Sequence, residues 1–174
     1  RPWALSLLEC HMDRAIKRRR HPDLGRFHQY LSLPHLASGR SRSQNAGMNL
    51  HLLPANEYRR ERWRNGLGWT REILRWPEES DAWDWRVSIA EVDKAGPFSR
   101  FEGCDRELVL LAGEGMHLVF ADDDSRTELL PPHGRHRFSG ERELAAELVS
   151  GPTQDFNLIW KRDRVDATLL HRPL

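Results

Sequence analysis

The chain has 174 residues but only two cysteines, Cys10 and Cys104. A small secreted protein held by disulfides has more cysteines at closer spacing, so we expect two free thiols in a reducing compartment. No window approaches the run of about eighteen apolar residues that a membrane-spanning helix needs. The apolar stretch at residues 3–8 is too short for a signal peptide. Together, these absences predict a soluble, cytoplasmic protein without a membrane partner.

Basic residues are concentrated at the N-terminal end, although the net charge is only +1. Residues 1–47 contain nine Lys/Arg and three Asp/Glu, whereas residues 48–174 contain eighteen Lys/Arg and twenty-three Asp/Glu. The cluster at 17–20 leaves a nuclear-localisation-like signal or a nucleic-acid-binding arm open as alternatives. However, the segment has too little apolar surface to offset the entropy of ordering, apart from one short candidate helix at 12–17. We predict that it is a disordered extension, or sequence upstream of a start at Met48, ahead of one domain.

From residue 48 onwards, short strands alternate with turns rich in Gly, Pro and Asp. The clearest period of two covers residues 84–92, where Trp85, Val87 and Ile89 share one face. Further strands are expected at 49–53, 70–76, 106–111, 116–120, 126–130, 136–138, 155–160 and 165–170. The strand at 70–76 is expected to alternate, with Thr70, Glu72 and Leu74 on one face. Residues 143–150 fit a helix or a strand, and their neighbours favour a strand. Turns at intervals of about 8–12 residues are typical of an antiparallel sandwich or barrel. The predicted fold class is all-β.

The common catalytic and metal-binding patterns are missing from residues 48–174. His133 and His136 are the only close histidine pair, and a spacing of three does not place two side chains on one face of a strand. A metal needs three or four converging ligands, so we predict no metal and no other cofactor. Neither a Gly-x-Ser-x-Gly elbow nor a phosphate-binding Gly-x-x-x-x-Gly-Lys loop is present. Cys104 lies beside Asp105, which raises rather than lowers a thiol pKa, so no catalytic residue is assigned.

Tryptophan and arginine are concentrated in the first part of this domain. Five of the seven tryptophans lie between Trp63 and Trp85. Aromatic rings interleaved with arginines can stack single-stranded bases. The negative net charge of residues 48–174 opposes phosphate binding, so we predict that nucleic acid is not a partner.

The stretch Trp63–Ile73 joins a Gly66-Leu67-Gly68 turn to a predicted strand. Tryptophan offers a flat wall to a planar ligand, and Asn and Thr side chains offer neutral hydrogen bonds. An arginine on a strand can hold a carboxylate through two parallel bonds. We predict a pocket for a small polar or anionic ligand, lined by Trp63, Asn65, Thr70, Arg71, Arg86 and Arg106. The alternative for each arginine is a surface position or an ion pair with a neighbouring carboxylate.

The same stretch, Trp63-Arg64-Asn65-Gly66-Leu67-Gly68-Trp69-Thr70-Arg71-Glu72-Ile73, resembles the Trp-Lys-Asn-Gly-Gly-Gly-x-Thr-Arg-Glu-Ile motif of the HutD/Ves family. Residues 85–90, 96–106 and 155–158 match three more family blocks in the same order. Four ordered blocks over about residues 48–160 are far more specific than one glycine motif.

The resemblance implies a cupin-like (RmlC-like) antiparallel β-barrel or jelly roll, as one half of a two-barrel family fold. It also implies a role in bacterial histidine utilisation, as a non-enzymatic regulator that binds urocanate or a related carboxylate. Urocanate is planar and has a carboxylate and an imidazole, which suits Arg, Asn and Trp side chains. A metal-independent cupin-like enzyme acting on a histidine catabolite is one alternative. A truncated half-domain without ligand binding is another.

Two departures from the family pattern lead to further expectations. Leu67 stands at the central glycine of the motif, so the turn is expected to be reshaped if that position has positive φ. Family members continue well beyond the 155–158 block, so the chain is expected to lack the C-terminal half of the family fold. A missing half would uncover a sheet edge, which leaves a homodimer or other self-association open.

Overall fold

The structure is a computed structural model that describes residues 6–14, 27–32 and 58–173. Within these ranges the chain forms thirteen β-strands and no helix, which confirms the all-β prediction. The strands are β1 (Ser6–Arg14), β2 (Phe27–Ser32), β3 (Arg59–Arg62), β4 (Gly68–Trp76), β5 (Trp85–Val92), β6 (Gly96–Pro97), β7 (Cys104–Ala112), β8 (Met116–Phe120), β9 (Arg126–Leu129), β10 (Arg135–Ser139), β11 (Leu144–Leu148), β12 (Thr153–Lys161) and β13 (Val165–Pro173).

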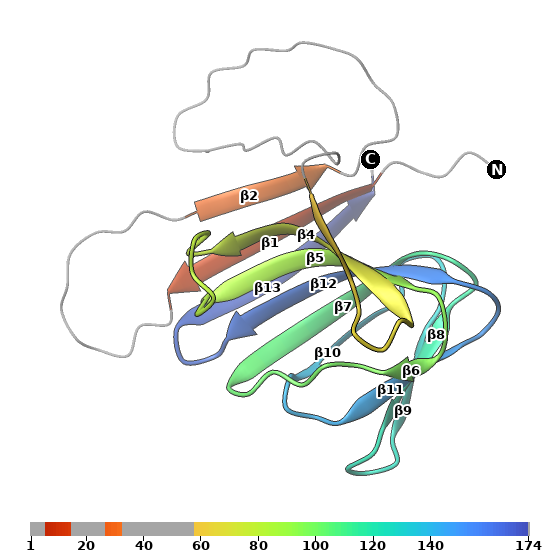
Figure 1. Cartoon of the computed structure of the whole chain (residues 1–174). Coiled ribbons are helices and arrows are strands. Elements are labelled where there is room, and N and C mark those ends of the chain that lie inside the picture. Colours follow the sequence, from red (N-terminus) through yellow and green to blue (C-terminus); the bar gives the residue numbers. More distant parts are fainter. Residues whose placement is uncertain (1–5, 15–26, 33–57, 174) are drawn as a thin grey trace.

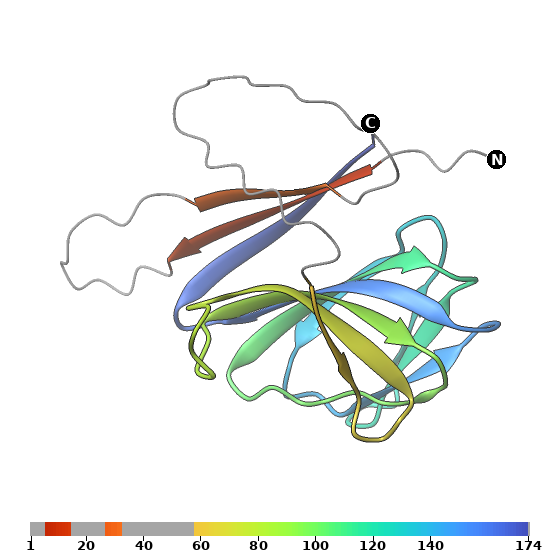
Figure 2. The same ribbon diagram turned by 45° about the horizontal axis from the view of Figure 1, so that its top comes forward.

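The strands form three antiparallel sheets. The central sheet has six strands in the order β10-β7-β12-β5-β4-β3. A four-stranded sheet, β6-β11-β8-β9, lies against its inner face, and a three-stranded sheet, β13-β1-β2, lies on its outer side (Figures 1 and 2). After a short turn at residues 162–164, the chain passes from β12 in the central sheet to β13 in the outer sheet.

The alternation predicted for β5 places its side chains in two separate environments. Val87 and Ile89 belong to an apolar cluster between the central and outer sheets, together with Phe156 of β12. A second cluster fills one end of the space between the central and four-stranded sheets, and includes Leu108 of β7 and Phe120 of β8. The central sheet is therefore a wall shared by two cores.

The alternation predicted for β4 holds only up to its middle. The pairing of β4 with β5 shifts between Glu72 and Leu74, which marks a β-bulge. Beyond it, Leu74 packs against the outer cluster and Arg75 pairs with Arg86. The prediction that Leu74 shares a face with Glu72 is therefore wrong, because a bulge inserts one residue and reverses the facing.

Part of the basic N-terminal segment, residues 1–47, is described. β1 and β2 pair with each other, and β1 pairs with β13. The short helix considered at 12–17 is wrong for residues 12–14, which belong to β1. Cys10 and Met12 are buried in the outer cluster, which supplies the apolar contact that β1 needs. Residues 15–26 and the strand expected at 49–53 lie outside the described residues.

Candidate functional site

A cavity of about 300 Å³ opens on the inner face of the central sheet. Its walls come from β3, β4, β5, β7 and β12, together with the turn at 63–65 and the segment 97–101. Four arginines and two glutamates are among the lining residues, so the ionised side chains give the cavity a net positive charge. A cavity of this polarity favours an anion.

The structure brings five of the six predicted pocket residues together around this cavity. They are Trp63, Asn65, Thr70, Arg86 and Arg106. Arg71 lies elsewhere, because it alternates with Thr70 on β4 and pairs with Ile89, an outer-face residue of β5. Its Nε lies 2.8 Å from a carboxylate oxygen of Glu91.

The turn before β4 is held by hydrogen bonds within the stretch Trp63–Thr70. The indole Nε1 of Trp63 donates to Thr70 Oγ1 at 2.8 Å, and the Asn65 side chain accepts from the backbone N–H of Leu67 at 3.0 Å. Gly66 has a φ of +72°, whereas Leu67 does not have positive φ. Leu67 therefore occupies the turn without backbone strain, because the left-handed conformation falls on the preceding glycine.

Gly68 is required for a different reason, since its backbone passes close to β5. A Cβ at this position would overlap the carbonyl oxygen of Glu91 and touch the ring of Trp63. The second glycine of the motif therefore allows β4 to approach β5 while Trp63 stays against the cavity.

Arg106 of β7 is the most deeply buried cation of the cavity, with 3% of its surface exposed. Its Nη1 donates to the backbone oxygen of Ser99 at 3.0 Å. The guanidinium carbon lies 5.3–5.5 Å from the ring centres of Phe98, Phe101 and Phe138. Burial lowers the pKa of Arg106 to about 10, so the side chain is charged at neutral pH. The Nε atom is buried and has no hydrogen-bond partner.

Arg86 of β5 lies two strands away from Arg106, with Ile159 of β12 between them. Its guanidinium carbon is 5.3 Å from the ring centres of Trp83 and Phe101. Burial lowers the pKa of Arg86. Its Nε, like that of Arg106, is buried without a partner. Two guanidinium groups with unused donors thus converge on one cavity.

Sequence reasoning missed several polar residues at or beside the cavity, among them Glu72, Asp155 and Asn157. Glu72 and Asn157 line the cavity. Asp155 does not line the cavity but pairs with Ala90, which does. It is fully buried, and neither of its carboxylate oxygens has a hydrogen-bond partner. Burial raises the pKa of Asp155 to about 7, although the charge of Arg106 opposes this shift. One feature of the sequence could have indicated Asp155 and Asn157. They are polar residues at alternate positions of the otherwise apolar strand Asp155-Phe156-Asn157-Leu158.

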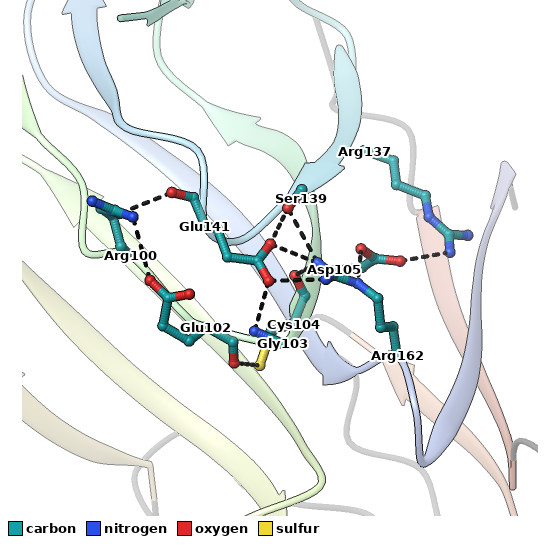
Figure 3. Close-up of polar contacts among 9 residues, drawn as sticks. All are labelled: Arg100, Glu102, Gly103, Cys104, Asp105, Arg137, Ser139, Glu141 and Arg162. Carbon is teal, nitrogen blue, oxygen red and sulfur yellow. Dashed lines mark hydrogen bonds and ion pairs between the residues drawn. The ribbon is translucent and has the colours of Figure 1, made fainter. Parts of the chain in front are cut away.

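The segment that supplies Phe98, Ser99 and Phe101 is fixed by a polar network centred on Arg162 (Figure 3). Arg162 donates to both carboxylate oxygens of Glu141, at 2.9 and 2.7 Å, and to Asp105 at 3.1 Å. Glu141 in turn accepts from the backbone N–H of Gly103 at 2.7 Å. Hydrogen bonding to Arg162 holds the pKa of Glu141 well below its usual range, so the carboxylate is charged. This network positions the wall of the cavity opposite β4.

The family model for HutD matches residues 55–174. The chain belongs to the HutD family. The family model thus confirms the resemblance, with a match that runs beyond residue 160 to the end of the chain.

The relatives of this HutD chain include a protein named after the hutC region and a protein named Ves. An uncharacterized 21.2 kDa protein in the hutC 3' region of Pseudomonas putida is 41% identical over 121 residues, covering 69% of this chain and 63% of that protein. Protein Ves of Escherichia fergusonii is 41% identical over 99 residues, covering 56% of this chain and 50% of its own length. The chain therefore spans between half and two thirds of the curated relatives it matches.

Solved structures agree with the family assignment. HutD from Pseudomonas fluorescens SBW25 is 36% identical with a TM-score of 0.56, covering 62% of this chain and 58% of that one. More distant cupin-like structures share the fold alone, at a TM-score of 0.50. The predicted cupin-like jelly roll is confirmed.

Within residues 6–14, 27–32 and 58–173, no group of three or more His, Cys, Asp or Glu side chains is placed to hold a metal ion. The same residues contain no helix with the length and hydropathy to span a membrane.

Proposed function

We propose that this HutD-family chain binds a small carboxylate such as urocanate in the cavity, and that it serves histidine utilisation by binding rather than by turnover. The observation that supports the proposal is the pair of guanidinium groups of Arg86 and Arg106. Both face one cavity, and both have a buried Nε without a hydrogen-bond partner. Buried donors of a charged group are costly to leave unpaired, and a carboxylate accepts two such bonds at once.

The size and walls of the cavity suit a small planar ligand. Its volume of about 300 Å³ is at the lower end of the range of about 300–1,000 Å³ for ligand pockets. Trp63, Phe98 and Phe101 are among the lining residues, and aromatic rings favour flat partners. The link to histidine utilisation is supported by the hutC neighbourhood in the name of the Pseudomonas putida relative.

The proposal is tested by calorimetric titration of urocanate into the full chain. We expect binding in the micromolar to millimolar range, with recovered urocanate chemically unchanged. Replacing Arg86 by Gln removes a charge-assisted hydrogen bond and is expected to weaken binding by about tenfold to a hundredfold. Arg106→Gln is expected to weaken it at least as much. Circular dichroism establishes that each variant is folded.

Arg71→Gln is the matched control, because Arg71 lies on the opposite face of the same sheet. We expect it to leave the affinity within about twofold, a difference of about 0.4 kcal/mol. Absence of heat and of any thermal shift at millimolar urocanate, in the wild-type chain, would refute the proposal. Turnover of urocanate that is lost in Arg86→Gln would replace it with the enzymatic alternative.

A further inference from the structure

Asp155 is a buried carboxyl group at the boundary between the cavity and the second apolar cluster. On one side it pairs with Ala90 of β5, which lines the cavity. On the other side it pairs with Leu110 of β7, which belongs to the cluster. Residues paired directly across antiparallel strands point to the same face. Asp155 therefore lies on the inner face of the central sheet, beside the cavity but without lining it.

The wall of the cavity comes near Asp155 in two directions. The Cβ atoms of directly paired residues are about 4.5–5.5 Å apart, which sets the distance to Ala90. Asn157, the next inner-face residue of β12, lines the cavity and lies about 6.6 Å along the strand, since each residue advances the chain by about 3.3 Å. At such distances a charge on Asp155 acts on an anion in the cavity through the low-dielectric interior, without contact between them.

The surroundings of Asp155 oppose a negative charge. The residue has no exposed surface, and neither of its carboxylate oxygens has a hydrogen-bond partner. Arg106, which is 3% exposed, is the cation whose charge favours the ionised form. Because burial outweighs this attraction, the pKa of Asp155 is raised to about 7. The carboxyl group therefore gains and loses its proton close to neutral pH.

Other charged or titratable groups on the inner face come from the central sheet itself. They are Arg59, Glu61 and Arg62 of β3, Glu72 and Arg75 of β4, Arg86 of β5 and His136 of β10. The facing strands β8, β9 and β11 contribute the apolar side chains of the second cluster. His136 lies against the rings of Phe120 and Phe138, and burial lowers its pKa. All these groups are retained in a variant of Asp155, so a comparison with that variant isolates one carboxyl group.

Arg106 is shared between Asp155 and the cavity. It lines the cavity, and its buried Nε has no hydrogen-bond partner. When Asp155 is neutral, the full charge of Arg106 attracts an anion in the cavity. When Asp155 is ionised, its negative charge offsets that of Arg106 and repels the anion. Linkage is reciprocal, so a bound anion must in turn favour the neutral form of Asp155.

We infer that Asp155 couples ligand binding to the uptake of a proton: the cavity binds its anion more tightly when the Asp155 carboxyl is neutral, and binding draws a proton from solvent onto that carboxyl. The inference rests on the proposed carboxylate site and adds its regulation by pH. A fall in pH through the neutral range then increases occupancy of the cavity at a fixed ligand concentration.

The test measures urocanate affinity of the full chain at pH 6 and pH 8.5, in wild type and in Asp155→Asn. We expect the two proteins to agree within about twofold at pH 6, where both side chains are neutral. At pH 8.5 we expect wild type to bind about tenfold more weakly than the variant. The ionisation of the urocanate imidazole is common to both proteins and cancels in this ratio. A ratio that is the same at both pH values would overturn the inference.

Two further variants separate the charge of Asp155 from its packing and from burial in general. Asp155→Leu has a similar volume next to Leu110, so it serves as a second neutral variant and is expected to behave as Asp155→Asn does. Glu107→Gln is the matched control, because Glu107 is also buried with a raised pKa but pairs with Leu158 of the outer cluster. It should retain the pH dependence of wild type. Loss of that dependence in Glu107→Gln would overturn the assignment to Asp155.

Proton uptake gives a readout that needs no variant. Calorimetric titration of wild type with urocanate at pH 8, in two buffers of different ionisation enthalpy, counts the protons taken up on binding. We expect a fraction of one proton per ligand, and less in Asp155→Asn. Binding without uptake in wild type would overturn the inference and leave the carboxylate site standing. Absence of binding at every pH would refute the proposed function itself.

Discussion

Arg71 and Glu91 form an ion pair on the outer face of the central sheet, with Arg71 Nε 2.8 Å from a Glu91 carboxylate oxygen. Arg60 of β3 reaches the same carboxylate at 2.6 Å. Thr70 and Glu72, the two neighbours of Arg71 on β4, line the cavity on the inner face. Arg71, an arginine of the family motif, is therefore part of the support of the sheet, while the residues beside it face the cavity.

Replacement of Arg71 by Gln should reduce stability without changing ligand selection. The ion pair is partly exposed, and Arg60 still pairs with Glu91 in the variant, so we expect a loss of about 0.5–1 kcal/mol in the free energy of unfolding. Urea denaturation at neutral pH measures this loss. A loss of more than about tenfold in urocanate affinity would contradict the placement of Arg71 on the outer face.

The two glycines of the motif should respond differently to substitution. Gly68→Ala places a Cβ against the Glu91 carbonyl, so we expect it to destabilise the fold by about 2 kcal/mol or more. A Cβ on Gly66 would meet only Arg62 Nη2, at an ordinary contact distance of 3.8 Å, but φ is positive, so Gly66→Ala should cost only about 1 kcal/mol. Gly66→Asn, which tolerates this conformation, is the control and should cost less. Equal losses for Gly66→Ala and Gly68→Ala in chemical denaturation would contradict this account.

Asp155 should make the protein less stable as the pH rises. Burial raises its pKa to about 7 in the folded chain, from an ordinary value of 3.8. Between these two values the folded state binds a proton that the unfolded state has released, so the free energy of unfolding falls with increasing pH and levels off above about 7.

The measurement compares wild type with Asp155→Asn in urea denaturation at pH 5 and pH 8. We expect wild type to lose on the order of 2 kcal/mol relative to the variant over this interval. A difference that is flat or of opposite sign would contradict a pKa of about 7 for Asp155 in the folded chain. The comparison isolates one carboxyl group because all other titrating groups are shared.

Glu141 should stabilise the wall of the cavity through its bonds to Arg162 and to the backbone of Gly103. Glu141→Gln replaces a charged acceptor by a neutral one, and we expect a loss of about 1–3 kcal/mol. Since the pKa of Glu141 is depressed in the folded chain, its contribution is present at neutral pH and is lost as the pH falls below the ordinary range of a glutamate.

Glu102→Gln is the matched control for Glu141, because the Glu102 side chain is exposed and, among the contacts described, bonds only Arg100, at 3.3 Å. It should change stability by less than about 0.5 kcal/mol. Hydrogen exchange at the Gly103 amide should accelerate in Glu141→Gln and not in the control. Unchanged exchange in both variants would mean that the network does not hold this segment.

The period of two in the sequence was sufficient to predict strands whose two faces differ. β5 illustrates this, because the face formed by Trp85, Val87 and Ile89 is buried in the outer cluster. β3 was not predicted, since its four residues are all charged and exposed, and therefore show no apolar alternation. The bulge in β4 was also hidden, because nothing in the order of residues distinguishes an inserted residue from a regular one.

Part of the candidate site could also be predicted from local sequence. The motif turn placed Trp63, Asn65 and Thr70 together, because they are close in sequence and joined by local hydrogen bonds. The period of two places Arg71 and Thr70 on opposite faces of β4, but it does not indicate which face lines the cavity. Asp155 and Asn157 were missed because their significance depends on pairing with β5, which is distant along the chain.

The shared central sheet has an evolutionary consequence. Along β5, Arg86 and Ala90 line the cavity, whereas Val87 and Ile89, which lie between them in sequence, belong to the apolar cluster on the other side. Mutations that change what is bound and mutations that change whether the chain folds therefore fall on alternate positions of one strand. A lineage can alter the wall of the cavity by substituting every second residue of β5 while the intervening residues stay constant. Selection on the cavity and selection on folding can thus act on neighbouring codons almost independently.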